Sequence, residues 1–145
     1  MLKLPAKKQI FINEFLKRPL TARLATVDKE HRPHVVPVWF GWDGDCLWIS
    51  SYSNTRKVQN IKCNPFISIA VDTEEMNGTT KAVVLEGKAK LITSPRDFLK
   101  QKFTWIYERY MGSEGVRAKE PQSWINDEKN LLIRLMPQKV TTWDW

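Results

Sequence analysis

The segment from 47 to 65, LWISSYSNTRKVQNIKCNP, carries the residues best suited to bind a charged ligand. It begins with strand-forming residues, passes through a turn rich in hydroxyl and amide groups, and continues as a short basic helix that Ser53 or Asn54 can cap. Arg56 and Lys57 lie in the first helical turn, where the helix dipole disfavours cations unless an anion lies in front of them. Free N–H groups, hydroxyls and paired cations are typical of a phosphate site. A solvated basic turn is the alternative, and this segment alone does not separate the two.

Little else in the sequence indicates catalysis by side chains. His31 and His34 are the only histidines and flank a predicted hairpin turn, which argues against zinc catalysis. Cys46 and Cys63 lack a CxxC pattern and are expected to be free thiols. No nucleophile, acid–base pair or metal-binding cluster is evident. We therefore assign no catalytic side chain and no metal site.

Length and charge narrow the class of protein. The 145 residues are expected to form a single domain, 1–145, that is large enough to bury a core. The net charge of 23 − 16 = +7 favours anionic partners: phosphorylated cofactors, nucleic acid or acidic membranes. No apolar run approaches the length needed to span a bilayer, and the N-terminus lacks the features of a secretory signal. The expectation is a cytoplasmic protein without a membrane partner.

Short stretches of alternating apolar residues predict a mainly β protein, a β-barrel with peripheral helices. Short turns join the first three strands, which predicts an antiparallel meander. Pro37 cannot donate a hydrogen bond to a neighbouring strand, so it is expected at an edge, bulge or gap, and Gly87 is expected to mark a bend. The strands are predicted at 21–27, 34–42, 46–51, 65–72, 82–92, 131–136 and 139–145.

Helices are expected beside these strands in addition to the basic helix. The chain begins with an amphipathic helix near Pro5, and a longer helix starts at Ser94, which can cap it, and ends near Gly112. The region 113–130 is polar and poorly periodic, with a helical turn around Trp124. The apolar residues expected to pack are Ile10, Phe11 and Phe15 in the first helix and Phe98, Phe103, Ile106 and Tyr110 in the longer one.

The order of these motifs resembles the pyridoxamine 5′-phosphate oxidase-like split β-barrel family, and specifically its flavin- and deazaflavin-dependent oxidoreductase branch. The matching pieces cover nearly the whole chain, and their combination is specific although each alone is weak. They are ARLATV at 22–27, RPHVVPVWFGWDGDCLWIS at 32–50, SNTRKVQNIKCNPFISIAVD at 53–72, LEGKAKLI at 85–92 and the closing PQKVTTWDW.

The resemblance implies a six- to seven-stranded antiparallel split β-barrel that works as a homodimer, with a flavin in a groove at the dimer interface. It places Arg56 and Lys57 on the flavin phosphate, with Thr55 and Ser51 as hydroxyl donors and Ser50 beside them. The backbone of Val38 and Trp39 is expected to face the polar edge of the ring, and Trp143 and Trp145 are expected to pack nearby from the partner subunit.

The function implied is that of an FMN-binding oxidoreductase, which transfers hydride through the flavin between a nicotinamide or reduced deazaflavin and an unidentified small molecule. FMN is preferred to the deazaflavin coenzyme F420 because nothing marks a site for a polyglutamate tail. The pyridoxal-phosphate-binding residues of the classical oxidase have no clear counterpart, so oxidation of pyridoxamine phosphate is not predicted. A deazaflavin-dependent reductase and a non-catalytic flavin- or haem-binding module are the alternatives. A nucleic-acid-binding barrel is the weakest hypothesis, because the basic residues are spread along the chain.

Several of these residues also have structural interpretations. Arg23 is expected either to reach the phosphate or to pair with a carboxylate across the sheet. One of Trp39 and Trp42 is expected in the core, and His34 on the surface of a strand. The paired tryptophans at 143 and 145 share a face, which favours joint burial, and Cys63 is expected to pack as a small apolar residue.

Overall fold

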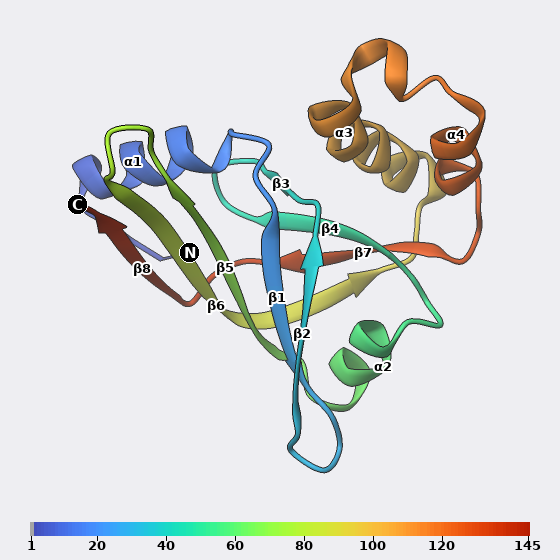
Figure 1. Ribbon diagram of the computed structural model, residues 1–145. Helices are drawn as coiled ribbons and strands as arrows, with labels where there is room; N and C mark the ends of the chain where they lie inside the picture. The colour runs from blue at the N-terminus through green and yellow to red at the C-terminus, as the bar shows by residue number, and fades with distance from the viewer. Residues whose placement is uncertain (1) are drawn as a thin grey trace.

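The computed structural model describes residues 2–145, which form a curled antiparallel sheet with helices packed against it (Figure 1). The strands are β1 (Ala22–Val27), β2 (Pro33–Val38), β3 (Gly41–Trp42), β4 (Leu47–Tyr52), β5 (Phe66–Glu74), β6 (Thr80–Ile92), β7 (Asn130–Leu135) and β8 (Lys139–Asp144). The helices are α1 (Ala6–Leu16), α2 (Arg56–Cys63), α3 (Arg96–Gly115) and α4 (Lys119–Ile125). The predicted mainly β architecture with peripheral helices is confirmed.

The strands follow the order β2-β1-β5-β6-β7-β4-β3, and β8 pairs with β6. The long strand β6 changes partner along its length, since its first half pairs with β8 and its last residues pair with β7. Gly87 lies at this change, where a Cβ atom would be 3.1 Å from the backbone nitrogen of Gln138. Glycine therefore permits this close approach. Strand β6 can then pair with β8 before Gly87 and with β7 after it, in agreement with the bend predicted at this residue.

The predicted meander of the first three strands is confirmed only in part: β1 pairs with β2 and β3 pairs with β4, both antiparallel, but the middle strand is divided. The stretch 34–42 does not continue as one strand: it breaks after Val38 into β2 and the short β3, which accounts for the eighth strand. Because Phe40 is fully buried, the chain turns inward there and leaves β1. Strand β4 then pairs with β3 and β7 rather than with β2. Strand β2 remains an edge strand, consistent with Pro37, and a gap separates it from β4.

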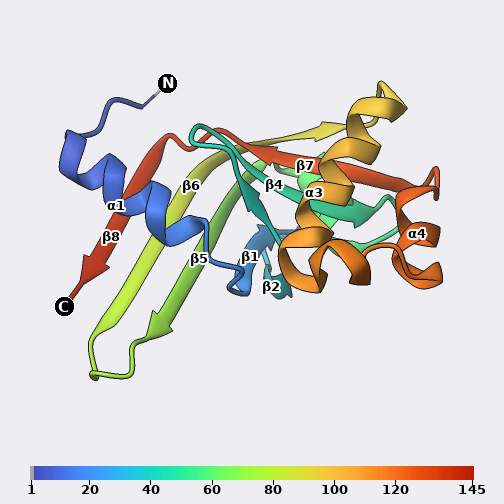
Figure 2. The same ribbon diagram turned by 90° about the horizontal axis from the view of Figure 1, so that it is seen from above.

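The inner face of the curled sheet carries the larger core. Alternate residues of β1 and β5 point into it, including Leu24 and Ile69, and α1 covers it with Ile12, Phe15 and Leu16 (Figure 2). Ile10, predicted to be buried, is 58% exposed because the buried stripe of α1 follows Ile12 instead. This is the expected packing of a sheet whose side chains alternate between faces.

Helices α3 and α4 cover the opposite face of β4 and β7, so these two strands are buried on both sides (Figure 2). The apolar residues of α3 at this contact include Leu99, Phe103 and Tyr107, which pack against Trp48 and Leu132. The expected cap at Ser94 was wrong, since Pro95 occupies the N-cap and no side chain caps the helix. The first regular stretch of α3 ends at Gly112 as predicted, where a φ of 79° breaks the helix before a short second stretch to Gly115, and the predicted helical turn around Trp124 is α4.

A membrane-spanning helix is not found among residues 2–145, because none of their helices combines sufficient length with sufficient apolar character.

Candidate functional site

The turn between β4 and α2 is built from hydroxyl groups. Thr55, rather than Ser53 or Asn54, is the N-cap residue of α2. Its hydroxyl donates to the carbonyl oxygen of Tyr52 at 2.8 Å and lies 2.9 Å from the hydroxyl of Ser51. No side chain caps the N–H groups of the first helical turn, and that turn carries no acidic residue. The start of the helix thus presents backbone donors and hydroxyls without an acidic residue of its own, as is typical of a phosphate site.

The two cations of this turn differ in their surroundings. Lys57 is half-buried, and burial lowers the pKa of its ammonium group. Within residues 2–145, no carboxylate lies within ion-pair distance of it. Arg56 has a side chain that is 56% exposed, and its Nη2 lies 4.0 Å from Oδ2 of Asp28. Lys57 is therefore the cation that most lacks a counter-charge.

Asp28 is held ionised beside Arg56. The backbone N–H of Arg32 donates to its carboxylate, and this hydrogen bond with its neighbours lowers the pKa of Asp28 to about 2. The positive charge of Arg56 is therefore partly compensated by the ionised carboxylate of Asp28. Arg23 has its own partner, Asp72, with its Nη1 2.6 Å from Oδ1, so the carboxylate alternative expected for Arg23 is confirmed.

An open groove of about 340 Å³ lies between the end of β2, strand β4 and the start of α2. This volume is within the range of small-molecule sites. Helices α3 and α4 close its other side. Its lining contains most of the predicted site residues, namely Val38, Trp39, Ser50, Ser51, Thr55 and Lys57, together with Pro37, Tyr52, Tyr107, Trp124 and Asn130. Arg56 does not line it.

Trp39 forms an aromatic wall of the groove. The residue is 37% exposed, and its ring stacks on Tyr110 with the ring centroids 4.7 Å apart and the planes 3° from parallel. Trp42 is buried, and its Nε1 donates to Asn13 at 2.9 Å, so one of these two tryptophans is in the core as predicted. Tyr110 is itself fixed, because its hydroxyl donates to the carbonyl oxygen of Leu20 at 2.7 Å.

Three residues of the groove floor, Tyr107, Trp124 and Asn130, were missed from the sequence, whereas Ser50 was predicted. The Ser50 hydroxyl lies 2.8 Å from the Tyr107 hydroxyl, and Nδ2 of Asn130 donates to that same hydroxyl at 2.9 Å. Burial raises the pKa of Tyr107. Trp124 packs edge-to-face on Tyr107 at 5.5 Å. The three missed residues come from α3, α4 and the start of β7, and the only signal for Tyr107 and Trp124 was a large side chain with a polar group among the apolar positions of those helices.

Trp143 and Trp145 do not reach this groove within one chain. Trp143 lies on β8, where it pairs with Ala82 of β6, and Trp145 follows that strand, with its backbone hydrogen-bonded to Thr80. Their rings are 6.4 Å apart, but Trp145 is 67% exposed, so the expected joint burial does not occur within the described chain. Their contact with a cofactor bound by a partner subunit stays a prediction.

Three smaller predictions concern His34 and the two cysteines. His34 is half-exposed on β2 as expected, and burial, followed by the charges of Arg56 and Lys57, lowers its pKa. Cys63 is exposed at the last position of α2, so its predicted packing was wrong, because the buried face of that helix carries Val58 and Ile61 instead. Both cysteines are free thiols, as predicted.

Comparison with known proteins agrees with this geometry. The family model for pyridoxamine 5′-phosphate oxidase matches residues 10–144. The chain belongs to this family. The split-barrel fold predicted from the sequence is thereby confirmed. Sequence comparison with curated proteins gives no significant match.

Solved structures with the pyridoxamine 5′-phosphate oxidase fold superpose closely on the chain. A conserved hypothetical protein from Mycobacterium tuberculosis is 21% identical, with a TM-score of 0.78 over 99% of this chain and 86% of its own. An F420 reductase is 25% identical, with a TM-score of 0.70 over 89% of this chain and 94% of its own. A haem storage protein from Vibrio cholerae is 23% identical, with a TM-score of 0.71 over 90% of each chain. The fold therefore occurs in proteins with different ligands.

Proposed function

We propose that the protein is an FMN-dependent oxidoreductase that binds the flavin in the groove between β2, β4 and α2. The observation that carries this proposal is Lys57, a partly desolvated cation without a carboxylate partner among residues 2–145, beside the uncapped start of α2. Leaving a buried charge uncompensated is unfavourable, and a phosphate would remove that cost. Ser51 and Thr55 would supply hydroxyl donors, and Arg56 would contribute from the rim.

The ring end of the groove fits a flat cofactor. Trp39 presents a fixed indole there, and β2 ends at Val38, so backbone groups after it are available to the polar edge of a ring. A bound flavin would supply the hydride chemistry. The residues of this chain would bind and orient it and exclude water from one of its sides, without a catalytic acid or base.

Two alternatives have specific support. The similarity to an F420 reductase at 25% identity supports a deazaflavin in place of FMN, since a phosphate and a tricyclic ring suit the same groove. The similarity in fold to a haem storage protein supports a non-catalytic module. Haem iron is commonly held by His or Cys, and neither residue type is among the described residues that line the groove. We therefore favour a flavin or deazaflavin.

The cofactor proposal predicts a chromophore that can be reduced. Flavin should be recovered from the purified protein, or added FMN should lose fluorescence on binding at micromolar concentrations. Anaerobic NADPH should then bleach the bound flavin, because a nicotinamide can transfer hydride to it. Binding without bleaching by NADPH, NADH or reduced F420 would favour the cofactor store over the reductase. The free thiols at Cys46 and Cys63 are compatible with the cytoplasmic location that we include in the proposal.

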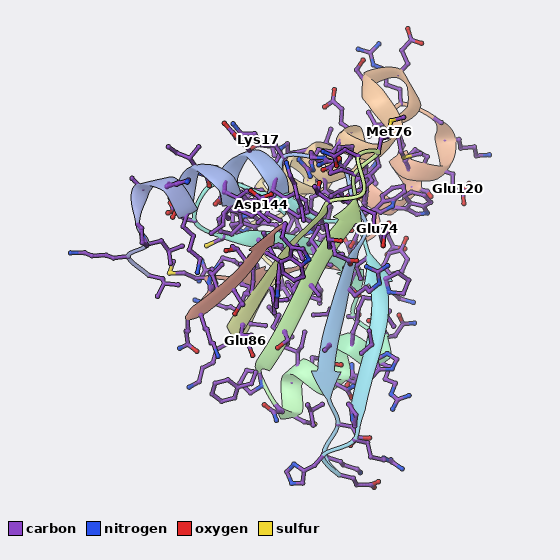
Figure 3. All side chains as sticks on the ribbon, turned by 60° about the vertical axis from the view of Figure 1, so that its left-hand side comes forward. Lys17, Glu74, Met76, Glu86, Glu120 and Asp144 are labelled. Atoms are coloured by element: carbon purple, nitrogen blue, oxygen red, sulfur yellow. The ribbon has the colours of Figure 1, made fainter. Side chains whose placement is uncertain are left out.

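We also propose that the protein is a homodimer formed through the outer face of β2, β1, β5, β6 and β8. Figure 3 looks onto this face, where the five strands lie side by side without a helix in front of them. Two pairs of opposite charge lie on it, Arg23 with Asp72 and Glu86 with Lys139, and most of the other residues are small or apolar. Pro37 belongs both to this face and to the groove, so a second copy would complete the groove. The face contains Ala25, Pro37, Ser68, Ala70, Ala82, Val84, Thr141 and Trp143.

A single charge placed in the middle of this outer face should separate the protomers. Ala70 lies between Arg23 of β1 and Val84 of β6, so Ala70→Arg would put a cation where two copies meet. We expect the wild type to sediment as a dimer and the variant as a folded monomer that binds FMN poorly. Gln101→Arg, at an exposed position of α3, is the matched control and should remain dimeric. A monomeric wild type at tens of micromolar would refute the interface.

A further inference from the structure

His34 lies on the face of β2 that helix α2 covers. It pairs with Thr26 of β1, and the side chains of such an antiparallel pair lie on the same face of the sheet. Thr26 is 1% exposed, and its hydroxyl oxygen accepts a hydrogen bond from Nδ2 of Asn60 in α2 at 3.0 Å. Side chains alternate along a strand, so Val38, which lines the groove, is on the same face as His34. The imidazole therefore lies beside α2, on the strand face that also contributes to the groove.

The nearest charges of α2 are positive. Arg56 and Lys57 precede Asn60 by four and three residues, so they lie on the side of the helix that faces Thr26. Burial lowers the pKa of the His34 imidazole, and the charges of Arg56 and Lys57 lower it further, as expected for cations close to it. In residues 2–145 no carboxylate forms an ion pair with this imidazole.

The acidic groups of the neighbouring β1–β2 turn are engaged with arginines. Asp28, whose pKa is lowered to about 2, pairs with Arg32 and lies 4.0 Å from Arg56. Glu30 pairs with Arg32 at 2.6 Å, and Lys29 is an exposed cation. A protonated imidazole on β2 would therefore have no counter-ion of its own in the described chain.

A phosphate bound at the start of α2 would supply that counter-ion. Its negative charge would offset the repulsion from the two cations and favour the protonated imidazole. We propose that His34 is a third cationic group of the phosphate site and takes up a proton when the phosphate binds. This rests on the proposed function, in which the anion is the phosphate of FMN. His34 acts through its charge, so the affinity for FMN rises as the pH falls through the titration of the imidazole.

Other groups of the site titrate with a different sign or in a different range. The phosphate of FMN takes up its second proton near pH 6, about as a phosphorylated side chain does, and this weakens its attraction to cations at low pH. Burial lowers the pKa of Lys57, but an ammonium group starts from an alkaline value. Asp28 stays ionised at neutral pH. A gain in affinity on going from about pH 8 to about pH 6.5 is therefore the signature of an imidazole.

NMR titration tests the proposal directly, because the chain contains only two histidines. The imidazole signals are followed against pH in the protein alone, with riboflavin and with FMN. His31→Asn assigns the two signals, since asparagine tolerates the positive φ of 64° at that exposed turn position. We expect FMN to raise the pKa of His34 by about one pH unit and riboflavin, which lacks the phosphate, to leave it unchanged. The pKa of His31 should not respond to either ligand.

Fluorescence titration of FMN then connects this proton to affinity. A rise of one pH unit in the pKa corresponds to about tenfold tighter FMN binding by the protonated form. The Kd of His34→Gln, relative to that of wild type, should therefore be about fivefold larger near pH 6 than near pH 8. Comparing the two proteins at the same pH cancels the titration of the phosphate itself. His31→Asn is the matched control and should follow wild type at every pH.

A pKa of His34 that does not change when FMN binds would overturn the proposal. Equal rises with FMN and riboflavin would also overturn it, and so would a Kd ratio between His34→Gln and wild type that is independent of pH. These results leave the proposed function intact, because the quenching of flavin fluorescence reports FMN binding separately. If FMN does not bind to wild type at all, the proposed FMN site fails together with this inference.

Discussion

Replacing Lys57 by alanine is expected to weaken FMN binding by about 2–3 kcal/mol, or roughly 30- to 150-fold in Kd. The reason is that Lys57 is desolvated and has no carboxylate partner in the described chain, so its charge is available to the phosphate. Arg56→Ala should cost less, about 1 kcal/mol, because its guanidinium is largely exposed and already faces Asp28. Equilibrium titration of flavin fluorescence measures both effects.

Riboflavin serves as the ligand control for this prediction, because it carries the same ring without the phosphate. Its affinity should change less than about twofold in Lys57→Ala if the lysine contacts only the phosphate. Lys62→Ala removes a cation from the last turn of the same helix and should leave FMN binding unchanged. Equal losses for FMN and riboflavin would instead assign Lys57 to the ring or to the fold.

Removing the guanidinium of Arg109 is expected to destabilise the protein by about 2–4 kcal/mol, since hydrogen bonds from charged donors are among the strongest individual contacts. Arg109 of α3 donates to the carbonyl oxygens of Leu16, Lys17 and Arg18 at the end of α1. It also donates to the carbonyl oxygen of Phe40 at 3.0 Å. A cation is favourable at a helix C-terminus, so the substitution removes the cap of α1. It also removes the hydrogen bonds that join α3 to α1 and to the segment before β3.

Urea unfolding of Arg109→Ala should therefore show a lower midpoint with an unchanged slope. Arg109→Lys keeps the charge but not the planar fork and should recover only a small part of the loss. Arg117→Ala, at an exposed position just after α3, should change stability by less than about 0.5 kcal/mol. A midpoint for Arg109→Ala equal to that of Arg117→Ala would show that these hydrogen bonds contribute little.

The parts of the fold that follow from local patterns were predictable. Alternation of apolar residues in 21–27 and 65–72 identified the strands β1 and β5. The basic helix after β4 could also be placed, because turn residues and an apolar stripe at helical spacing adjoin a strand. Pro37 was also informative, because a proline lacks the N–H group wherever it lies and therefore favours an edge position in a sheet.

The missed features depend on contacts between distant segments. The sequence around Phe40 looks continuous with a strand, but burial of that ring turns the chain away from β1 and separates β2 from β4. Tyr107 and Asn130 are far apart in sequence and meet only because α3 and α4 pack on β4 and β7. Similarly, Asp28 comes close to Arg56 because α2 packs against β1, which Asp28 follows. Local sequence patterns carry no information about these encounters.

The central claim is that the groove beside Lys57 holds a flavin by its phosphate, and titration of the wild-type protein with FMN and riboflavin tests it most directly. We predict saturable quenching by FMN at micromolar concentrations, with riboflavin binding at least about tenfold more weakly because it cannot engage the cation. F420 is titrated in parallel, since it carries a phosphate on a related ring. Absence of binding by FMN and F420 alike, or equal affinity for FMN and riboflavin, would contradict the account.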